Sequence, residues 1–140
     1  MNTIIDNEKE IIEDFALFSD WEDKYEYIIS LGRELPLISD QYKTEDHLVR
    51  GCQSRVWLHA EKKGDNIVFT ADSDAIITKG IIAMLIKVLS DQPAAEVAKN
   101  ELKFIDTIGL KEHLSPNRSN GLVSMIEKMK TYALAFSSGI

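Results

Sequence analysis

The chain has 140 residues, of which 44% are hydrophobic and 28% are charged, and it contains a single cysteine. This length favours one domain over residues 1–140, large enough to bury a core without metal or disulfide staples. One cysteine excludes an internal disulfide framework and indicates a reducing compartment. Residues 1–6 show no signal-peptide pattern, and the longest apolar run is too short to span a membrane. We therefore expect a cytoplasmic protein.

The net charge of −7 is confined to the N-terminal segment. Residues 1–30 hold nine acidic and two basic side chains, whereas the rest of the chain holds fourteen of each. Nucleic-acid binding requires clustered Lys and Arg, so we expect neither nucleic acid nor a membrane as the main partner. An acidic face can attract a basic protein, although acids on a helix face are more often simply solvated.

Two amphipathic helices are predicted before residue 36. From Ile11 to Phe18 the apolar residues recur at helical spacing. Asp20 is the predicted N-cap of a second helix, whose apolar stripe begins at Trp21, and Pro36 ends it.

A polar connection over residues 36–50 precedes a predicted β-hairpin. Residues 54–62 and 67–72 alternate between apolar and polar side chains, and a turn signal over 63–66 joins them. Residues 47–50 are predicted to form a third short strand, which leads into the cysteine.

The most apolar stretch of the chain, residues 75–89, is predicted to be a central helix. Its apolar side chains cover nearly the whole circumference, which is typical of a helix buried on all sides. Ser73 or Asp74 is the predicted N-cap.

The C-terminal part is predicted to hold a short helix over residues 93–99, a loop over 115–121 and a last helix from Leu122. The order of elements predicts an α+β fold, with a small antiparallel sheet of about three strands packed against several helices.

The lone cysteine, Cys52, has an unusual setting. Arg50 and Gly51 precede it, and Gln53, Ser54 and Arg55 follow it. Nearby cations favour the thiolate, which is the nucleophilic form of cysteine. The alternative is an inert thiol buried in the core, where free cysteine is common.

Most other chemistry lacks its motif. There is no Walker loop or dinucleotide-binding glycine pattern, and one thiol cannot hold an iron–sulfur cluster. His47, His59 and His113 are too scattered for a structural zinc site, so we expect no metal. A Cys–His hydrolase remains open, because any of these histidines could approach Cys52 in space.

Four separated motifs in the right order resemble the SufE/CsdE family of sulfur-acceptor proteins. They are the segment from Trp21 to Pro36, the stretch Gly51-Cys52-Gln53-Ser54-Arg55-Val56-Trp57, the run Asp72-Ser73-Asp74-Ala75 with Lys79-Gly80-Ile81-Ile82-Ala83, and His113-Leu114-Ser115-Pro116-Asn117-Arg118-Ser119-Asn120-Gly121-Leu122. Related scaffold proteins share this fold but carry three cysteines. With a single cysteine, this chain resembles the acceptor proteins rather than the scaffolds.

The resemblance implies a carrier and activator rather than an enzyme. Cys52 would take persulfide sulfur from a group II cysteine desulfurase (SufS- or CsdA-like) and pass it towards a cluster scaffold such as a SufBCD-like complex. Pyridoxal phosphate would belong to the desulfurase, with no cofactor on this chain, and a homodimer is left open. A pure interaction module in which Cys52 is incidental is the remaining alternative.

The resemblance also suggests roles for the neighbours of Cys52. Gly51, Gln53 and Ser54 would shape the loop. Arg118 would contact the partner or the sulfur, or else form a structural salt bridge. Asp74 is expected to act as a helix cap beside the loop, and His113 as a structural or interface residue.

Overall fold

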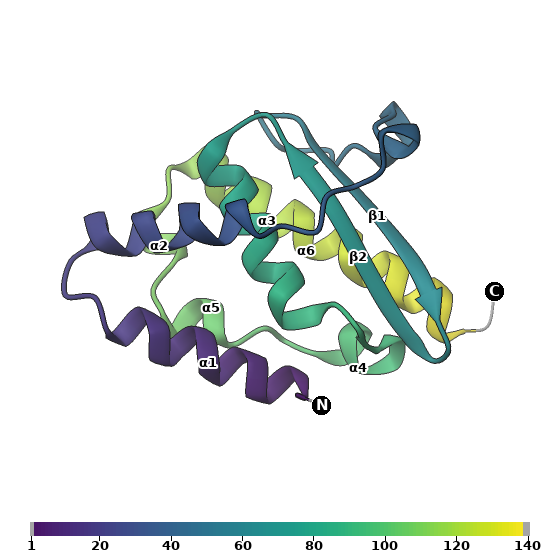
Figure 1. Cartoon of the computed structure of the whole chain (residues 1–140), viewed down its shortest axis with the longest axis horizontal. Coiled ribbons are helices and arrows are strands. Elements are labelled where there is room, and N and C mark those ends of the chain that lie inside the picture. Colours follow the sequence, from purple (N-terminus) through teal and green to yellow (C-terminus); the bar gives the residue numbers. More distant parts are fainter. Residues whose placement is uncertain (1, 139–140) are drawn as a thin grey trace.

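A long antiparallel hairpin forms most of the sheet in the computed structural model, which describes residues 2–138 (Figure 1). Strand β1 (Val56–Lys63) pairs along its whole length with β2 (Asn66–Ser73). The alternation predicted from sequence is confirmed, because Val56, Leu58 and Ala60 are buried while the residues between them lie nearer the surface.

The third strand does not lie where the sequence predicted it. Strand β3 (Gln92–Pro93) pairs with the start of β2, whereas residues 47–50 contribute only an isolated bridge between Leu48 and Trp57. Asp91 has φ of +58°, and its N–H donates to the carbonyl oxygen of Ile67 at 2.7 Å. This tight reversal brings the chain back onto the sheet.

Six α-helices and three short 3₁₀ turns complete the described chain. They are α1 (Ile4–Ala16), α2 (Trp21–Arg33), η1 (Asp40–Tyr42), η2 (Glu45–His47), α3 (Ile76–Leu89), α4 (Ala94–Lys99), α5 (Phe104–Thr107), η3 (Lys111–His113) and α6 (Pro116–Ser137). The N-cap predicted for the second helix is confirmed, since the Asp20 carboxylate accepts from the Asp23 N–H at 2.9 Å.

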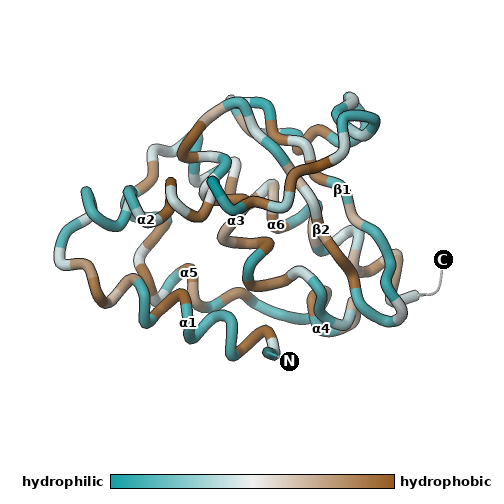
Figure 2. Tube along the Cα trace, in the orientation of Figure 1, coloured by the Kyte–Doolittle hydropathy of each residue, from teal (hydrophilic) through white to brown (hydrophobic). Residues whose placement is uncertain are grey.

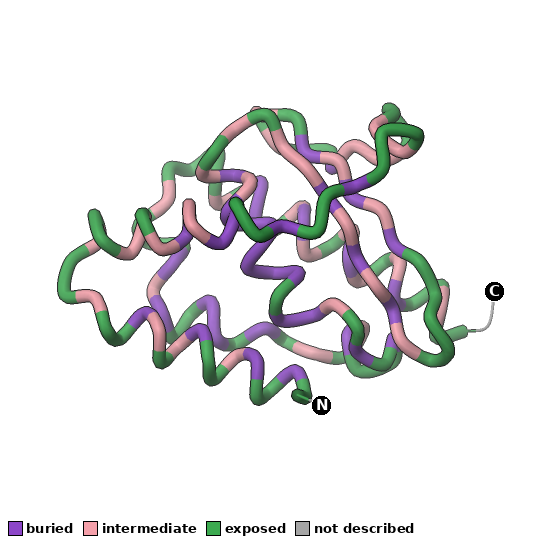
Figure 3. Tube along the Cα trace, in the orientation of Figure 1, coloured by how far each residue is buried: buried purple, intermediate pink, exposed green. Residues whose placement is uncertain are grey.

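Helices α3 and α6 pack against the hairpin, α3 on β2 and α6 on β1. The apolar residues face this interior, and α3 is the most continuously buried element (Figures 2 and 3). The prediction of a central helix is therefore confirmed. In residues 2–138, no helix has the length and apolar character needed to cross a membrane.

The predicted N-cap of α3 is wrong. Neither Ser73 nor Asp74 caps the helix, whose N-cap residue is Ala75 without a side-chain bond. Instead, the Asp74 carboxylate accepts from the Arg55 N–H at 3.1 Å, and the Ser73 hydroxyl donates to the Arg55 carbonyl at 2.8 Å. Both side chains are used to join the end of β2 to the start of β1.

The loop predicted over residues 115–121 is also wrong. Helix α6 begins at Pro116, and the Ser115 hydroxyl accepts from the Arg118 N–H at 3.3 Å as its N-cap. Proline is compatible with the first helical position, because its fixed φ suits the helix and its missing N–H has no partner there.

Candidate functional site

Gly51 positions the cysteine loop. Its φ is +91°, a conformation that side chains with a Cβ rarely adopt. A Cβ at this position would lie 2.5 Å from the hydroxyl oxygen of Ser124 on α6. The loop can therefore turn and lie directly on α6 only with glycine at this point.

Cys52 is half-buried against the same helix. Its Sγ lies 3.7 Å from the carbonyl oxygen of Gly121, in a geometry that allows a weak S–H hydrogen bond. A Cβ at Gly121 would be 3.2 Å from this sulfur, so the missing side chain leaves room for the thiol. Burial raises the pKa of the Cys52 thiol, which favours the protonated form.

The two flanking arginines do not activate the buried thiol as the sequence suggested. The guanidinium of Arg50 points to the carbonyl oxygen of Glu45, 3.5 Å away. Arg55 lines a separate hollow with Lys43 and Trp57. The two arginines are neighbours of Cys52 in the sequence, but neither guanidinium lowers the pKa of its thiol. Desolvation is the effect that shifts this pKa, and it raises it.

A cavity of about 280 Å³ opens beside the sulfur. It is lined by Cys52, Gln53, Ser54, Ala75, Thr78, Ile81, Ser115, Asn117, Arg118, Gly121 and Met125. The walls therefore come from the cysteine loop, the start of α3 and the start of α6. The cavity leaves ample space beside the thiol for an added sulfur atom.

The predicted site residues divide into two groups. Gln53, Ser54 and Arg118 lie with Cys52 around the cavity, and the Gln53 side-chain oxygen accepts from Asn117 Nδ2 at 3.2 Å. The salt bridge considered for Arg118 is not seen with any carboxylate of residues 2–138. Asp74 is not part of the cavity wall and acts on the loop only through Arg55.

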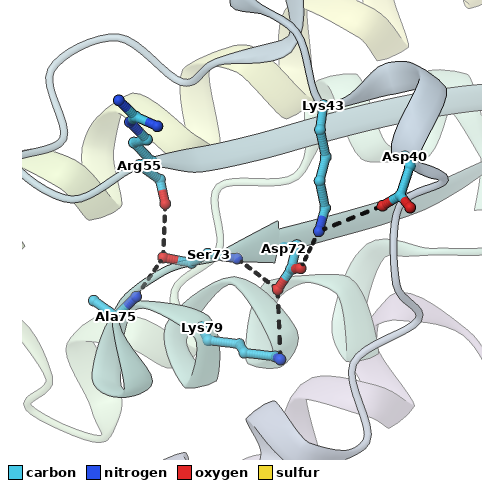
Figure 4. A network of polar contacts seen from close by, with 7 residues as sticks. All are labelled: Asp40, Lys43, Arg55, Asp72, Ser73, Ala75 and Lys79. Carbon is cyan, nitrogen blue, oxygen red and sulfur yellow. Dashed lines mark hydrogen bonds and ion pairs between the residues drawn. The ribbon is translucent and has the colours of Figure 1, made fainter.

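An ion-pair network lies next to this site at the open end of the hairpin, where β2 ends (Figure 4). The Asp72 carboxylate lies 2.7 Å from Lys43 Nζ and 3.4 Å from Lys79 Nζ, and it also accepts from the Ser73 N–H. Desolvation raises the pKa of Asp72, but the Lys43 hydrogen bond and the other contacts outweigh it and leave that pKa below its usual value. The network joins the connection before η2 to β2 and α3.

No histidine of the described chain lines the cavity. His113 stacks on Trp21 at 3.9 Å and contacts the Gly109 carbonyl, so it has a structural role. His47 and His59 contact each other. A hydrolase would require a histidine within hydrogen-bond reach of Cys52, and no such bond is present among residues 2–138. These residues also include no cluster of three or more His, Cys, Asp or Glu suited to a metal.

Sequence reasoning missed part of the cavity wall. Asn117 and Met125 were assigned to a loop and a separate helix, although both face the cysteine from α6. Their spacing with Gly121 is i, i+4 and i+8, which is one helix face. Starting the helix at Pro116 would have revealed this face.

The SufE family, described as an Fe–S metabolism associated domain, matches residues 9–133. The chain belongs to the SufE family. Uncharacterized SufE-like proteins of Rhizobium etli and Rhizobium meliloti are each 40% identical over 129 residues, which is 89% of this chain and 87% and 92% of those proteins. The chain thus has a role in iron–sulfur metabolism.

A plant SufE relative is longer. The chloroplastic/mitochondrial SufE-like protein 1 of Arabidopsis thaliana is 38% identical over 90% of this chain, but over 34% of its own length. A hypothetical protein from Thermus thermophilus, solved in solution, superposes with a TM-score of 0.80, covering 96% of this chain and 97% of that one. At 18% identity this likeness supports the α+β fold alone.

Proposed function

We propose that Cys52 is the sulfur acceptor of a SufE-type carrier, which takes persulfide sulfur from a group II cysteine desulfurase and delivers it onward for cluster assembly. The observation that carries this proposal is the position of the only cysteine, half-buried on the wall of a cavity of about 280 Å³. The cavity provides space next to the sulfur for an additional atom.

The transfer is an exchange between sulfur atoms. The Cys52 thiolate attacks the terminal sulfur of the donor persulfide, the donor S–S bond breaks, and a new S–S bond forms on Cys52. The donor cysteine leaves as a thiolate and takes up the proton that Cys52 has lost. No external oxidant or reductant is needed, and no cofactor is needed on this chain because the pyridoxal phosphate belongs to the desulfurase.

The buried thiol must leave the cavity to react. Burial raises the pKa of Cys52, so the thiol in its tucked position is a poor nucleophile. Moving the loop into the partner's site removes this desolvation, while return to the cavity shields the persulfide from oxidants in solution. Gly51, Gln53 and Ser54 shape this loop, Asp74 anchors its outer end, and Arg118 faces the partner or the sulfur.

The proposed partners are a SufS- or CsdA-like desulfurase and a SufBCD-like scaffold, and the proposed compartment is the cytoplasm. One free cysteine fits a reducing environment. The protein then acts as a carrier and activator rather than an enzyme.

The test compares desulfurase turnover with wild type and with Cys52→Ser, measured as sulfide release in the presence of a reductant. We expect stimulation by wild type alone, and intact mass should show one or more sulfur atoms added to wild type. A matched control is Ser124→Ala, which removes a hydroxyl near the loop but leaves the thiol in place. It should retain sulfur loading.

Equal stimulation by wild type and Cys52→Ser would contradict the acceptor role and indicate an interaction module. Absence of both stimulation and mass gain with every desulfurase of the host would contradict the proposal as a whole. Circular dichroism of each variant shows whether a loss reflects unfolding instead of lost chemistry.

A further inference from the structure

Two histidines meet at the junction between η2 and β1. Nε2 of His47 lies 3.1 Å from Nδ1 of His59. Their outer nitrogens are also engaged, since Thr44 Oγ1 lies 3.1 Å from His47 Nδ1 and Glu61 Oε1 lies 3.3 Å from His59 Nε2. The Tyr42 ring stacks on His59 with centroids 3.7 Å apart. Both imidazoles are partly buried in this arrangement.

These partners define where the protons lie. An ionised Glu61 carboxylate can only accept, so His59 carries a proton on Nε2 and its Nδ1 accepts from the Nε2–H of His47. The Thr44 hydroxyl can hydrogen-bond to Nδ1 of His47 whether or not that nitrogen carries a proton, because a hydroxyl can donate or accept. The contact survives while one ring is neutral. When both rings are imidazolium, two N–H groups oppose each other across 3.1 Å.

Burial and nearby charges together oppose the protonation of His47. Burial, His59 and Lys128 of α6 all lower the pKa of His47, while Asp46 of η2 acts in the other direction. Glu61 of β1 is the carboxylate in contact with His59.

The same neighbourhood includes further titratable groups. Burial lowers the pKa of Lys128, and the nearby charge of Arg50 lowers it further. Lys128 remains bound to the segment, donating to the carbonyl oxygens of Asp46 and Leu48 at 3.3 and 3.1 Å. Tyr42 of η1 covers the outer face of His59.

The histidine pair holds the approach segment, residues 44–50, which leads directly to Gly51 and Cys52. The other links between this segment and β1 are few. They are the Leu48–Trp57 bridge and the Val49 N–H, which donates to the Val56 carbonyl at 2.8 Å. Releasing the segment would lengthen the free loop that carries the thiol.

We propose that His47 and His59 form a pH-dependent latch, which fixes the approach segment to β1 and releases it when both imidazoles are protonated. The latch is independent of the proposed sulfur transfer. It predicts a cysteine loop that is more mobile in mild acid than at neutral pH.

The direct test is amide hydrogen exchange at about pH 7.5 and about pH 4.5, because the depressed pKa of His47 places double protonation below the usual histidine range. The Val49 protection factor should fall about three- to tenfold in acid, the factor given by one net hydrogen bond. In His47→Gln the fall should be absent, because the amide retains a donor but does not titrate. The Val68 amide, which faces β1 in the hairpin, is the internal control and should be unchanged.

Thiol reactivity gives a second readout. The rate of Cys52 reaction with 4,4′-dithiodipyridine, taken as the ratio of wild type to His47→Gln at each pH, cancels the intrinsic titration of the thiol. We expect a ratio near one at neutral pH and a severalfold rise in acid. The matched control His113→Gln should behave as wild type. Equal Val49 protection at both pH values, or the same fall in wild type and His47→Gln, would overturn the latch.

Discussion

The close crossing of α2 and α3 provides a sharp test of the packing that supports the site. Gly80 of α3 faces the backbone of Ile28, and a Cβ added there would lie 2.3 Å from the Ile28 carbonyl oxygen and 2.8 Å from its carbonyl carbon. Because these are backbone atoms, Gly80→Ala forces one helix to move. Overpacking of this kind costs about 3 kcal/mol, and alanine regains about 1 kcal/mol of helix propensity.

The expected net loss is therefore about 2 kcal/mol, which corresponds to a fall in Tm of about 7 °C for a chain of this length. Urea unfolding followed by circular dichroism measures the free energy, and thermal unfolding measures Tm. Helix α3 also contributes Thr78 and Ile81 to the cavity, so the displaced helix should increase alkylation of Cys52 as well.

Gly32→Ala is the matched control. It makes the same substitution on the opposite side of the same crossing, where the added Cβ would lie 3.1 Å from the Gly80 nitrogen and 3.3 Å from its Cα. A shift of a few tenths of an ångström relieves these contacts, and the gain in propensity offsets it, so the stability change should stay within about 1 kcal/mol. Equal destabilisation by both variants, or no loss in Gly80→Ala, would refute the packing argument.

Two further outcomes are expected. Asp72→Asn should lower stability by about 1 kcal/mol at neutral pH in urea unfolding. The pKa of Asp72 is depressed in the folded state, so its contribution is complete above the unfolded value and is lost as pH falls through the folded one. The free energies of unfolding of the variant and of wild type should thus converge in strong acid. A difference that stays constant with pH would contradict this. Gly121→Ala should leave stability unchanged, but its added Cβ would lie 3.2 Å from the Cys52 sulfur and push the thiol outward, giving severalfold faster alkylation; an unchanged rate would contradict it.

Local patterns were sufficient for most of the fold. The alternation in residues 54–62 and 67–72 predicted the hairpin and its buried face, because a strand presents successive side chains to opposite sides. The apolar circumference of residues 75–89 predicted a central helix, since only burial on all sides removes such a surface from water. Asp20 was identified as an N-cap because the cap bond is made within one turn.

Local patterns failed where distant residues compete for the same groups. Ser73 and Asp74 are good helix caps in isolation, but the Asp74 carboxylate accepts from the Arg55 N–H across the hairpin. The Ser73 hydroxyl donates to the Arg55 carbonyl and accepts from the Ala75 N–H, which precedes the first residue of α3. The third strand depends on residues 92–93 returning to β2. Such a pairing is decided by the path of the whole chain and leaves no periodic signal in two residues.

The sequence by itself determined that this protein has one thiol, in a glycine-containing loop before a strand, within a SufE-like order of motifs. Only the tertiary structure decided the state of that thiol. Its surroundings come from Gly121, 69 residues away, and from α3, so burial governs the pKa of Cys52 while the adjacent Arg50 and Arg55 point elsewhere. The same is true of His47 and His59, whose contact depends on how the approach segment folds back on β1. Desolvation and proton sharing depend on distances in space, and these distances are set by packing.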